Sequence, residues 1–402
     1  MDFNLDARNE SYRKRIRDFV EQELLPLEQN PEAYDEHENI AHDHLEKMRA
    51  KAKQQGLWCL QIPGRLGGQG LDVSGMAACY EEMNRSIFGP VVLNSAAPDD
   101  GNMTVLAKVV TEAQQARWLK PIVEGRVRSS FVMTEPPPGC GSDPGMMQTT
   151  ATRKGDRWVI HGHKHYITGA ADASHFILIA RTSDDTRKGL SAFMFHKDDP
   201  GWEIFRRIPI MGPEEHVGHC ELRFDGLEIS DENRLMEVGD GLKVTQIRLG
   251  TARLTHCMRW LGSARRAQDI ALDYANRREA FGQTLGRHEG VGFMLADMAV
   301  ELYAAKSMLY RVAAEIDSGA DRSLIHSHAS ALKLHSSEVA GRVVDKALQI
   351  VGGRGYMREN PVERLYRDIR VDRIWEGTSE IQRNVVGGRL RKMGMSLYSD
   401  VA

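Results

Sequence analysis

The sequence has 402 residues, of which 41% are apolar and 27% are charged, and its formal net charge is −3. This length predicts two or three domains, and the near balance of charges offers no basic surface of the kind that binds nucleic acid. The five cysteines are widely spaced and form no CxxC pair, which argues against a disulfide framework or a zinc knuckle. No signal-peptide pattern begins the chain, and no apolar run reaches the about 20 residues that span a bilayer. We therefore expect a cytoplasmic protein, or one of the mitochondrial matrix if a transit peptide has been removed.

The first part of the chain is predicted to be a helical domain, residues 1–127. Apolar residues recur there at steps of three and four, which predicts helices over 42–55, 73–86 and 111–125. Gly56 is the expected C-cap of the first of these helices, and Thr111 is the expected N-cap of the last.

The pattern changes near residue 129, where short β-rich runs alternate with turn residues. The expected strands are 129–134, 157–160, 165–168, 176–180 and 192–196. Short strands at such spacing predict a β-barrel or sandwich, and we assign residues 128–238 to this middle β-domain.

Helical periodicity returns after residue 239 and is stronger than before. One apolar stripe comprises Leu254, Met258, Leu261, Ala264 and Ala267, and a second comprises Val291, Leu295, Met298, Leu302, Ala305, Leu309 and Val312. The Ser318–Ala320 break separates the second helix from a third, and long helices with short turns favour an antiparallel four-helix bundle over 239–402. The expected fold class is thus multidomain α+β, with a helical domain, a β-barrel or sandwich and a bundle in that order.

Three local patterns could carry chemistry, and each has a simpler reading. The loop 134–143 holds three prolines and two glycines, which suits a grip on a flat or anionic ligand but also suits a connector between strands. The glycines at 67–70 and 352–355 match neither a phosphate loop nor a dinucleotide fingerprint. His161, His163 and His165 would share one face of a strand, where they could hold zinc or simply line a solvated surface.

Glu376 lies between Trp375 and a glycine, just before an expected helix start. A carboxylate in such surroundings could be partly desolvated and serve as a general base. It could equally be an acid that the helix dipole favours.

Taken in order, eight segments resemble the acyl-CoA dehydrogenase family over essentially the whole chain. The segments are Gly67-Gly-Gln-Gly-Leu71, Met133-Thr-Glu-Pro136 with Gly141-Ser-Asp143, Gly162-x-Lys-x-Tyr-Ile-Thr168, Arg278-x-x-Phe-Gly-x-x-Leu285, Ala296-Asp-Met298, Gln349-Ile-Val-Gly-Gly-x-Gly-Tyr356, Pro361-Val-Glu-Arg-Leu-Tyr-Arg-Asp368 and Glu376-Gly-Thr-Ser-Glu-Ile-Gln382. The resemblance implies an FAD-dependent enzyme, with FAD between the β-domain and the bundle. It also implies a homotetramer or homodimer in which a neighbouring subunit reaches the cofactor.

The implied reaction is α,β-dehydrogenation of an acyl-CoA thioester to the trans-2-enoyl-CoA. A carboxylate removes the α-proton while the β-hydrogen leaves as hydride to the flavin, and electrons pass on to an electron-transferring flavoprotein. Two alternatives remain: an acyl-CoA oxidase on the same fold, and a non-catalytic acyl-CoA-binding scaffold. The acyl group itself is not predicted.

Site residues follow from matching positions within these segments. By its match to the last segment, Glu376 is the implied catalytic base. In some relatives the base instead precedes an arginine on the first long helix of the bundle, and Ala252 before Arg253 occupies that position here, which adds weight to Glu376. The implied substrate-binding residues are Ser142, Arg253 and Gly377. No metal site is expected. The implied cofactor-binding residues are Phe131, Met133, Thr134, Ser142, Tyr166, Thr168, Arg278, Phe281, His288, Gln349, Gly352, Gly353, Thr378 and Glu380.

Overall fold

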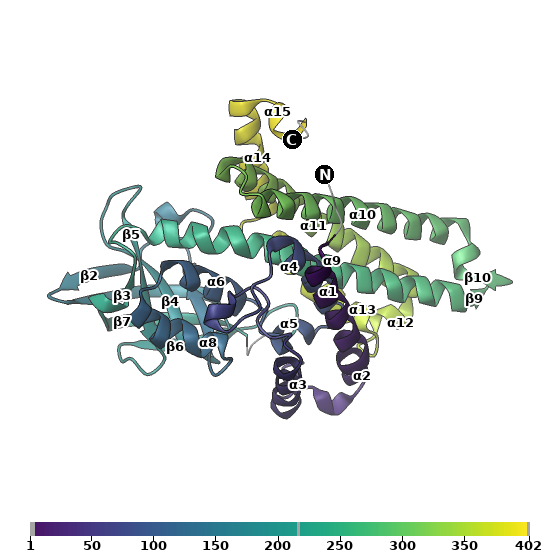
Figure 1. Cartoon of the computed structure of the whole chain (residues 1–402), viewed down its shortest axis with the longest axis horizontal. Helices are drawn as coiled ribbons and strands as arrows, with labels where there is room; N and C mark the ends of the chain where they lie inside the picture. Colours follow the sequence, from purple (N-terminus) through teal and green to yellow (C-terminus); the bar gives the residue numbers. More distant parts are fainter. Residues whose placement is uncertain (1–4, 215–217, 400–402) are drawn as a thin grey trace. The chain divides into compact units, whose positions relative to one another are not determined.

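The computed structural model describes residues 5–214 and 218–399, in which helices come first, a β-sheet follows and long helices complete the chain (Figure 1). This order confirms the predicted fold class. The chain forms two compact units. The bundle unit comprises Met1–Asn30, Leu71–Pro90 and Arg253–Ala402, and the sheet unit comprises Pro31–Gly70 and Val91–Ala252.

The helices of the bundle unit include the three longest of the chain. Most of α9 (Gly241–Arg277), from Arg253 onward, belongs here. The others are α1 (Ala7–Phe19), α2 (Leu25–Leu27), α4 (Val73–Met83), α10 (Glu289–Asp317), α11 (Arg322–Val351), α12 (Gly353–Tyr356), α13 (Pro361–Ile369), α14 (Ser379–Met393) and α15 (Ser396–Ser399). A short hairpin, β9 (Glu279–Ala280) with β10 (Gln283–Thr284), connects α9 to α10.

The apolar stripes explain why these long helices pack together. All five residues of the first stripe, on α9, are buried, as are Met298, Ala305, Leu309 and Val312 of the second, on α10. Helix α10 ends at Asp317, one residue before the predicted break. Helix α11 contacts α10, α13 and α14, so it lies at the centre of the bundle.

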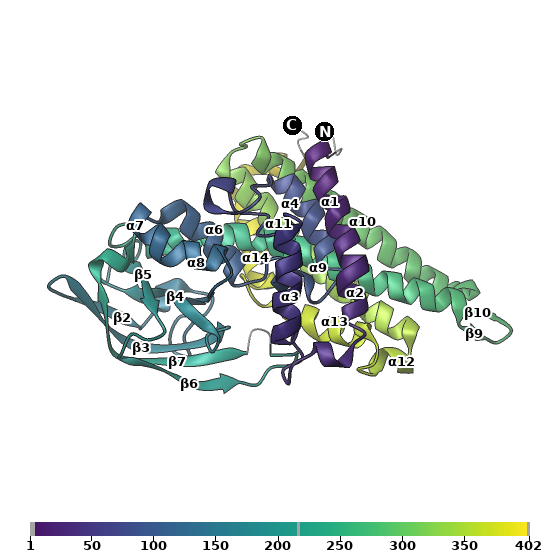
Figure 2. The ribbon, with the colours of Figure 1, turned by 60° about the horizontal axis from the view of Figure 1, so that its bottom comes forward.

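The sheet unit contains the strands β1 to β8 and a set of short helices. The strands are β1 (Arg128–Val132), β2 (Thr150–Lys154), β3 (Arg157–Thr168), β4 (Ala173–Arg181), β5 (Leu190–His196), β6 (Trp202–Ile208), β7 (His219–Ser230) and β8 (Arg234–Leu235). Their order is β6-β7-β3-β2-β4-β5-β8, and β1 pairs in parallel with β4. Figure 2 shows the strands from β6 to β5 side by side in this sheet. The helices are α3 (His42–Gln54), α6 (Asp99–Val109), α7 (Glu112–Gln114) and α8 (Lys120–Val123), while α5 (Gly89–Val92) crosses the division between the units.

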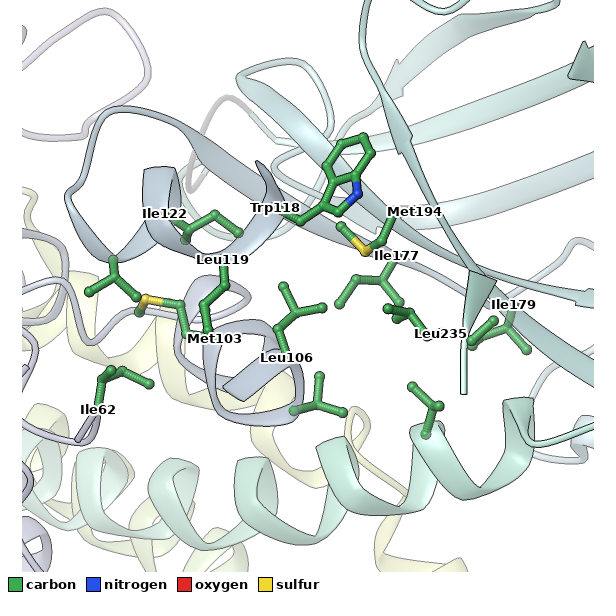
Figure 3. Close-up of a cluster of buried hydrophobic side chains, with 14 of the residues drawn as sticks. Ile62, Met103, Leu106, Trp118, Leu119, Ile122, Ile177, Ile179, Met194 and Leu235 are labelled. Carbon is green, nitrogen blue, oxygen red and sulfur yellow. The ribbon is translucent and has the colours of Figure 1, made fainter. Parts of the chain in front are cut away.

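The central run of β4, residues 176–180, is apolar and buried on both faces of the sheet. Ile177 and Ile179 point into a core that α6 and α8 also enter, shown in Figure 3 with Met103, Leu106, Trp118, Leu119 and Ile122. Phe176 and Leu178 point into a second core on the opposite face. Alternation along a strand thus supplies two cores from one run of residues.

Some sequence predictions of elements are confirmed and others are wrong. Thr111 caps α7 through a capping box with Gln114, and α3 ends as expected just before Gly56. The two strands predicted at 157–160 and 165–168 are wrong, because they form the single strand β3, in which irregular pairing with β7 interrupts the alternation. Strands β2, β6 and β7 were not predicted, since polar and exposed positions obscure the period of two in β2 and β6.

None of the helices within the described residues is long and apolar enough to cross a membrane.

Candidate active site

The backbone at Glu376 is held in an unusual conformation within the bundle unit. Its φ is +55°, in the left-handed region that side chains other than glycine rarely adopt. Such a conformation costs on the order of 1–2 kcal/mol and persists only where the surroundings impose it. The carbonyl of Glu376 accepts hydrogen bonds from Arg253 Nε at 2.9 Å and Gln382 Nε2 at 3.4 Å, which supply that restraint.

The backbone of the next residue, Gly377, is held by side chains in the same way. Gly377 has a φ of +90°, and its carbonyl accepts from Lys333 Nζ at 2.9 Å and Gln382 Nε2 at 3.0 Å. A Cβ at this position would lie only 2.6 Å from Gln382 Nε2. Both the conformation and the space therefore require glycine here.

Two cations, the buried Lys333 and the half-buried Arg253, thus contact the carbonyls of Gly377 and Glu376. Burial lowers the pKa of Arg253 and of Lys333 from their ordinary values, while the charge of Glu376 raises both and so partly offsets that effect. Because buried charge needs compensation, the two cations favour an anion in this position. The clamp formed by Arg253, Lys333 and Gln382 binds the backbone carbonyls of residues 376 and 377.

The carboxylate itself is largely buried and lies next to a histidine ring. The Glu376 side chain is 11% exposed, and its Oε1 is 3.9 Å from Nε2 of the buried His256. The His256 ring lies 5.0 Å from the ring of Trp375 and 5.5 Å from that of Trp260, measured between centroids. A largely dry carboxylate fixed on a restrained backbone is suited to removing a proton from a bound ligand.

Helix α14 begins directly after this clamp. Thr378 is its N-cap and accepts from the Ile381 N–H at 3.3 Å, and the Ser379 hydroxyl donates to Glu338 at 2.9 Å. Glu380 is exposed in the first turn, and a backbone hydrogen bond together with Thr378 lowers its pKa. The carboxylate of Glu380 therefore stabilises the helix start.

The residues matched to the adenosine pyrophosphate lie elsewhere in the bundle unit. Arg278 lines a pocket of about 300 Å³ together with Ile270, Asp273, Tyr274, Arg277, Arg354 and Asn360. Phe281 is 96% exposed with a φ of +53°. His288 is the N-cap residue of α10. Its Nδ1 lies 3.2 Å from Gln283 Nε2, and its Nε2 lies 3.0 Å from the Ala280 carbonyl oxygen. Gln349 and Gly353 are exposed and Gly352 is half-buried at the junction of α11 and α12.

The residues matched to the flavin in the sheet unit lie on β1, on β3 and at their ends. Phe131 lies under the Arg248 guanidinium, 4.5 Å from its ring centroid, and Met133 and Thr134 follow β1 directly. Tyr166 is 58% exposed with a φ of +58°, and its ring stacks on that of His165. Thr168 bonds His219 at 2.9 Å. Ser142 is exposed on the loop 134–143, away from any regular element.

These two residue sets fit the chemistry of FAD. Arginines at a pocket, such as Arg278 and Arg354, match the charge and fork geometry that a pyrophosphate needs. Exposed aromatic rings such as Tyr166 and Phe281, each on a backbone with positive φ, offer faces for a flat ring system.

A buried ion pair anchors the loop 134–143. Lys164 on β3 is fully buried and donates to Glu135 Oε1 at 2.9 Å and to the Met133 carbonyl at 2.7 Å. The Glu135 carboxylate also accepts from the N–H groups of Cys140, Gln148 and Thr149 at 2.7–3.0 Å. Glu135 therefore ties the start of the loop to Lys164 of β3, to Cys140 within the loop and to the residues that lead into β2.

The Glu135 carboxylate should make the stability of the folded protein depend on pH in the acid range. Although burial opposes its ionisation, Lys164 and the N–H donors lower its pKa to about 2, below the ordinary 4.5. The unfolded chain takes up this proton near pH 4.5 and the folded chain only near pH 2. The stabilisation is therefore complete above pH 4.5 and is lost as the pH falls toward 2. The test is the free energy of unfolding in urea, measured between pH 4.5 and pH 2. Over this pH range it should fall by about 3 kcal/mol more in the wild type than in a variant that lacks the Glu135 carboxylate.

The comparison uses the Glu135→Gln/Lys164→Met double variant, which lacks both charges. Glu36→Gln removes an exposed carboxylate and serves as the control that keeps the wild-type acid slope. If the free energy of unfolding fell equally with pH in the wild type and the double variant, the low pKa assigned to Glu135 would be contradicted.

The three histidines of β3 each have a local contact. His161 lies 3.3 Å from Asp225, His163 lies 2.6 Å from Glu221, and His165 stacks on Tyr166. In the part of the chain that the structure describes, no group of three histidine, cysteine or carboxylate side chains is arranged to hold a metal ion. The absence of a metal site stays a prediction, which zinc analysis of the purified protein tests.

Sequence reasoning did not single out His256, Lys333 or Gln382 as parts of the site. Gln382 closes the last matched segment, but its contacts depend on how α14 folds back onto residue 376. Lys333 lies 44 residues before Gly377, and no local pattern marks it. A usable signal for His256 is its spacing from Arg253, since residues three apart share a helix face.

Comparisons with known proteins agree along the chain. Family models described as the N-terminal, middle and C-terminal domains of acyl-CoA dehydrogenase match residues 6–126, 130–227 and 239–391. The probable acyl-CoA dehydrogenase FadE2 of Mycobacterium tuberculosis is 35% identical over 95% of each chain. The caffeyl-CoA reductase-Etf complex subunit CarC of Acetobacterium woodii is 36% identical over 96% of this chain and 98% of its own. The solved structure of butyryl-CoA dehydrogenase from Megasphaera elsdenii has a TM-score of 0.84 at 30% identity, over 97% of this chain and 100% of its own.

Proposed function

Because the chain belongs to the acyl-CoA dehydrogenase family, we propose that Glu376 removes the α-proton of an acyl-CoA thioester, which becomes the trans-2-enoyl-CoA. Members of this family are oxidoreductases that depend on FAD. The observation that carries the proposal is the carboxylate of Glu376, largely buried beside His256 on a backbone that Arg253 and Gln382 restrain.

The residues of this chain have distinct parts in the proposed reaction. The α-carbon loses its proton to a carboxylate oxygen of Glu376, which becomes neutral. FAD, when bound, accepts the β-hydrogen as hydride. Arg253, Lys333 and Gln382 hold the backbone carbonyls of Glu376 and Gly377, so the carboxylate need not reorganise as it takes up the proton. The Glu376 side chain is only 11% exposed, and this low exposure to water strengthens each of these electrostatic contacts.

The binding assignments from the matched segments are part of the same proposal. Thr378 and Glu380 at the start of α14, with Arg278, Phe281, His288, Gln349, Gly352 and Gly353, would hold the nucleotide half of FAD. Phe131, Met133, Thr134, Ser142, Tyr166 and Thr168 would face its flavin half, and Ser142, Arg253 and Gly377 would contact the thioester.

Arg278→Ala is expected to loosen FAD and to weaken subunit association together. A charge-assisted bidentate contact contributes about 1.5–3 kcal/mol, which corresponds to a tenfold to hundredfold loss of affinity. Retention of FAD on dialysis and the mass in solution measure the two effects. Arg287→Ala, an exposed arginine of the same connection, is the control that keeps both properties. Wild-type FAD retention in the Arg278 variant would contradict the assignment.

An anaerobic screen of flavin bleaching with short, long, branched and aromatic acyl-CoAs tests the reaction and finds the acyl group. Bleaching by at least one acyl-CoA supports dehydrogenation. Bound acyl-CoA without bleaching would instead support the scaffold alternative. Release of peroxide in air, in step with product, would support an oxidase.

We further propose an electron-transferring flavoprotein as the electron acceptor, which the name of the Acetobacterium relative supports, since it denotes a subunit of a complex with such a protein. A homotetramer or homodimer, a division into domains at 1–127, 128–238 and 239–402, and a cytoplasmic location stay predictions.

A further inference from the structure

His256 is a buried histidine directly beside the proposed base. Its side chain is 4% exposed, and its Nε2 lies 3.9 Å from Oε1 of Glu376. A histidine ring in an apolar surrounding needs polar partners for its nitrogens. The Glu376 carboxylate, which the proposed reaction uses, is one charged group within reach of this ring.

Helix α9 contacts residue 376 twice from one face. Arg253 donates to the backbone carbonyl of Glu376, and His256, three residues later, faces its carboxylate. Positions three apart lie side by side on a helix. The same helix therefore contacts both the main chain and the side chain of this residue.

The His256 ring is itself prevented from turning freely. Trp260, one turn further along α9, lies 5.5 Å from it at an interplanar angle of 34°, and Trp375 lies 5.0 Å away at 46°. Lys333 lies 5.8 Å from the Trp260 ring, so the indole is held as well. A ring packed against two indoles keeps its nitrogens in a fixed orientation.

We propose that His256 is a positioning residue for Glu376: its Nε2 orients the carboxylate toward the α-carbon of the bound thioester. The inference rests on the proposed function, because it takes Glu376 as the base. A separation of 3.9 Å is closed by a small side-chain rotation or bridged by one water. Displacing a reacting group by about 1 Å can cost a hundredfold in rate, so the orientation of this carboxylate matters.

Two variants of His256 separate orientation from packing. His256→Phe keeps a flat ring between the two indoles but removes both nitrogens, and His256→Gln loses the ring but keeps an N–H donor. We expect His256→Phe to slow anaerobic flavin reduction about 10- to 100-fold with unchanged affinity for acyl-CoA, and His256→Gln to recover at least half of that loss on a logarithmic scale. If the ring only fills space, His256→Phe will match the wild type and His256→Gln will be the slower variant, which would overturn the proposal.

A double-variant cycle with Glu376→Gln tests whether His256 acts through the base. In the Glu376→Gln background, His256→Phe should change the residual rate by less than twofold. An equal loss in both backgrounds would mean that His256 acts elsewhere and would overturn the inference. If Glu376→Gln by itself leaves the rate near that of the wild type, the proposed function fails instead, so the two failures are distinguishable.

Discussion

Glu376→Gln is expected to retain FAD and bind acyl-CoA while flavin reduction slows by at least 10²–10⁴-fold, the usual loss for a general base. Glutamine preserves the size of the side chain and can keep a polar contact with His256, but it cannot accept the α-proton. The Arg253 and Gln382 contacts to residue 376 involve its backbone carbonyl, so they survive the substitution. The fold of the site and the affinity for the thioester should therefore change little.

Stopped-flow reduction by the best acyl-CoA from the screen measures the rate, and titration of the oxidised flavin spectrum measures the affinity. Glu359→Gln, which alters an exposed carboxylate of the same unit, is the matched control and should behave as the wild type. If Glu376→Gln were reduced within about tenfold of the wild-type rate, the base would lie elsewhere.

The order of helices and strands was predictable because periodicity reports burial on one face. The stripe on α9 from Leu254 to Ala267 is buried at every position. Strand β6 shows where prediction from periodicity fails. Most of its residues are exposed, so its sequence has no apolar face to reveal a period of two. Only pairing with β7 identifies it as a strand.

The candidate site shows the same limit at the level of single residues. Glu376 could be found from its local segment, but its positive φ could not, since nothing in the chain marks a glutamate for that conformation. In the sequence, Lys333 is indistinguishable from the other polar positions of the long helix α11. Its role depends on a hydrogen bond to a carbonyl 44 residues away, which only the folded bundle creates.

The second large effect is expected from Lys164→Met, which should lower the free energy of unfolding by about 3–5 kcal/mol. Methionine matches the length of the lysine stem and fills the same buried space, so the loss comes from the missing charge. Glu135 would be left as a buried carboxylate without its cation, although three N–H groups still donate to it. Urea unfolding at pH 7, followed by tryptophan fluorescence, measures the change.

The Glu135→Gln/Lys164→Met double variant separates the cost of an uncompensated charge from the cost of lost contacts. Glutamine keeps an acceptor for the loop N–H groups and carries no charge, so the double variant should recover more than half of the stability that Lys164→Met loses. The Met133 carbonyl loses its donor in both variants. Because Met133 is among the residues proposed to face the flavin, FAD retention should therefore fall in the double variant as well as in the single one. A Lys164→Met loss below about 1 kcal/mol would mean that the pair does not hold this loop.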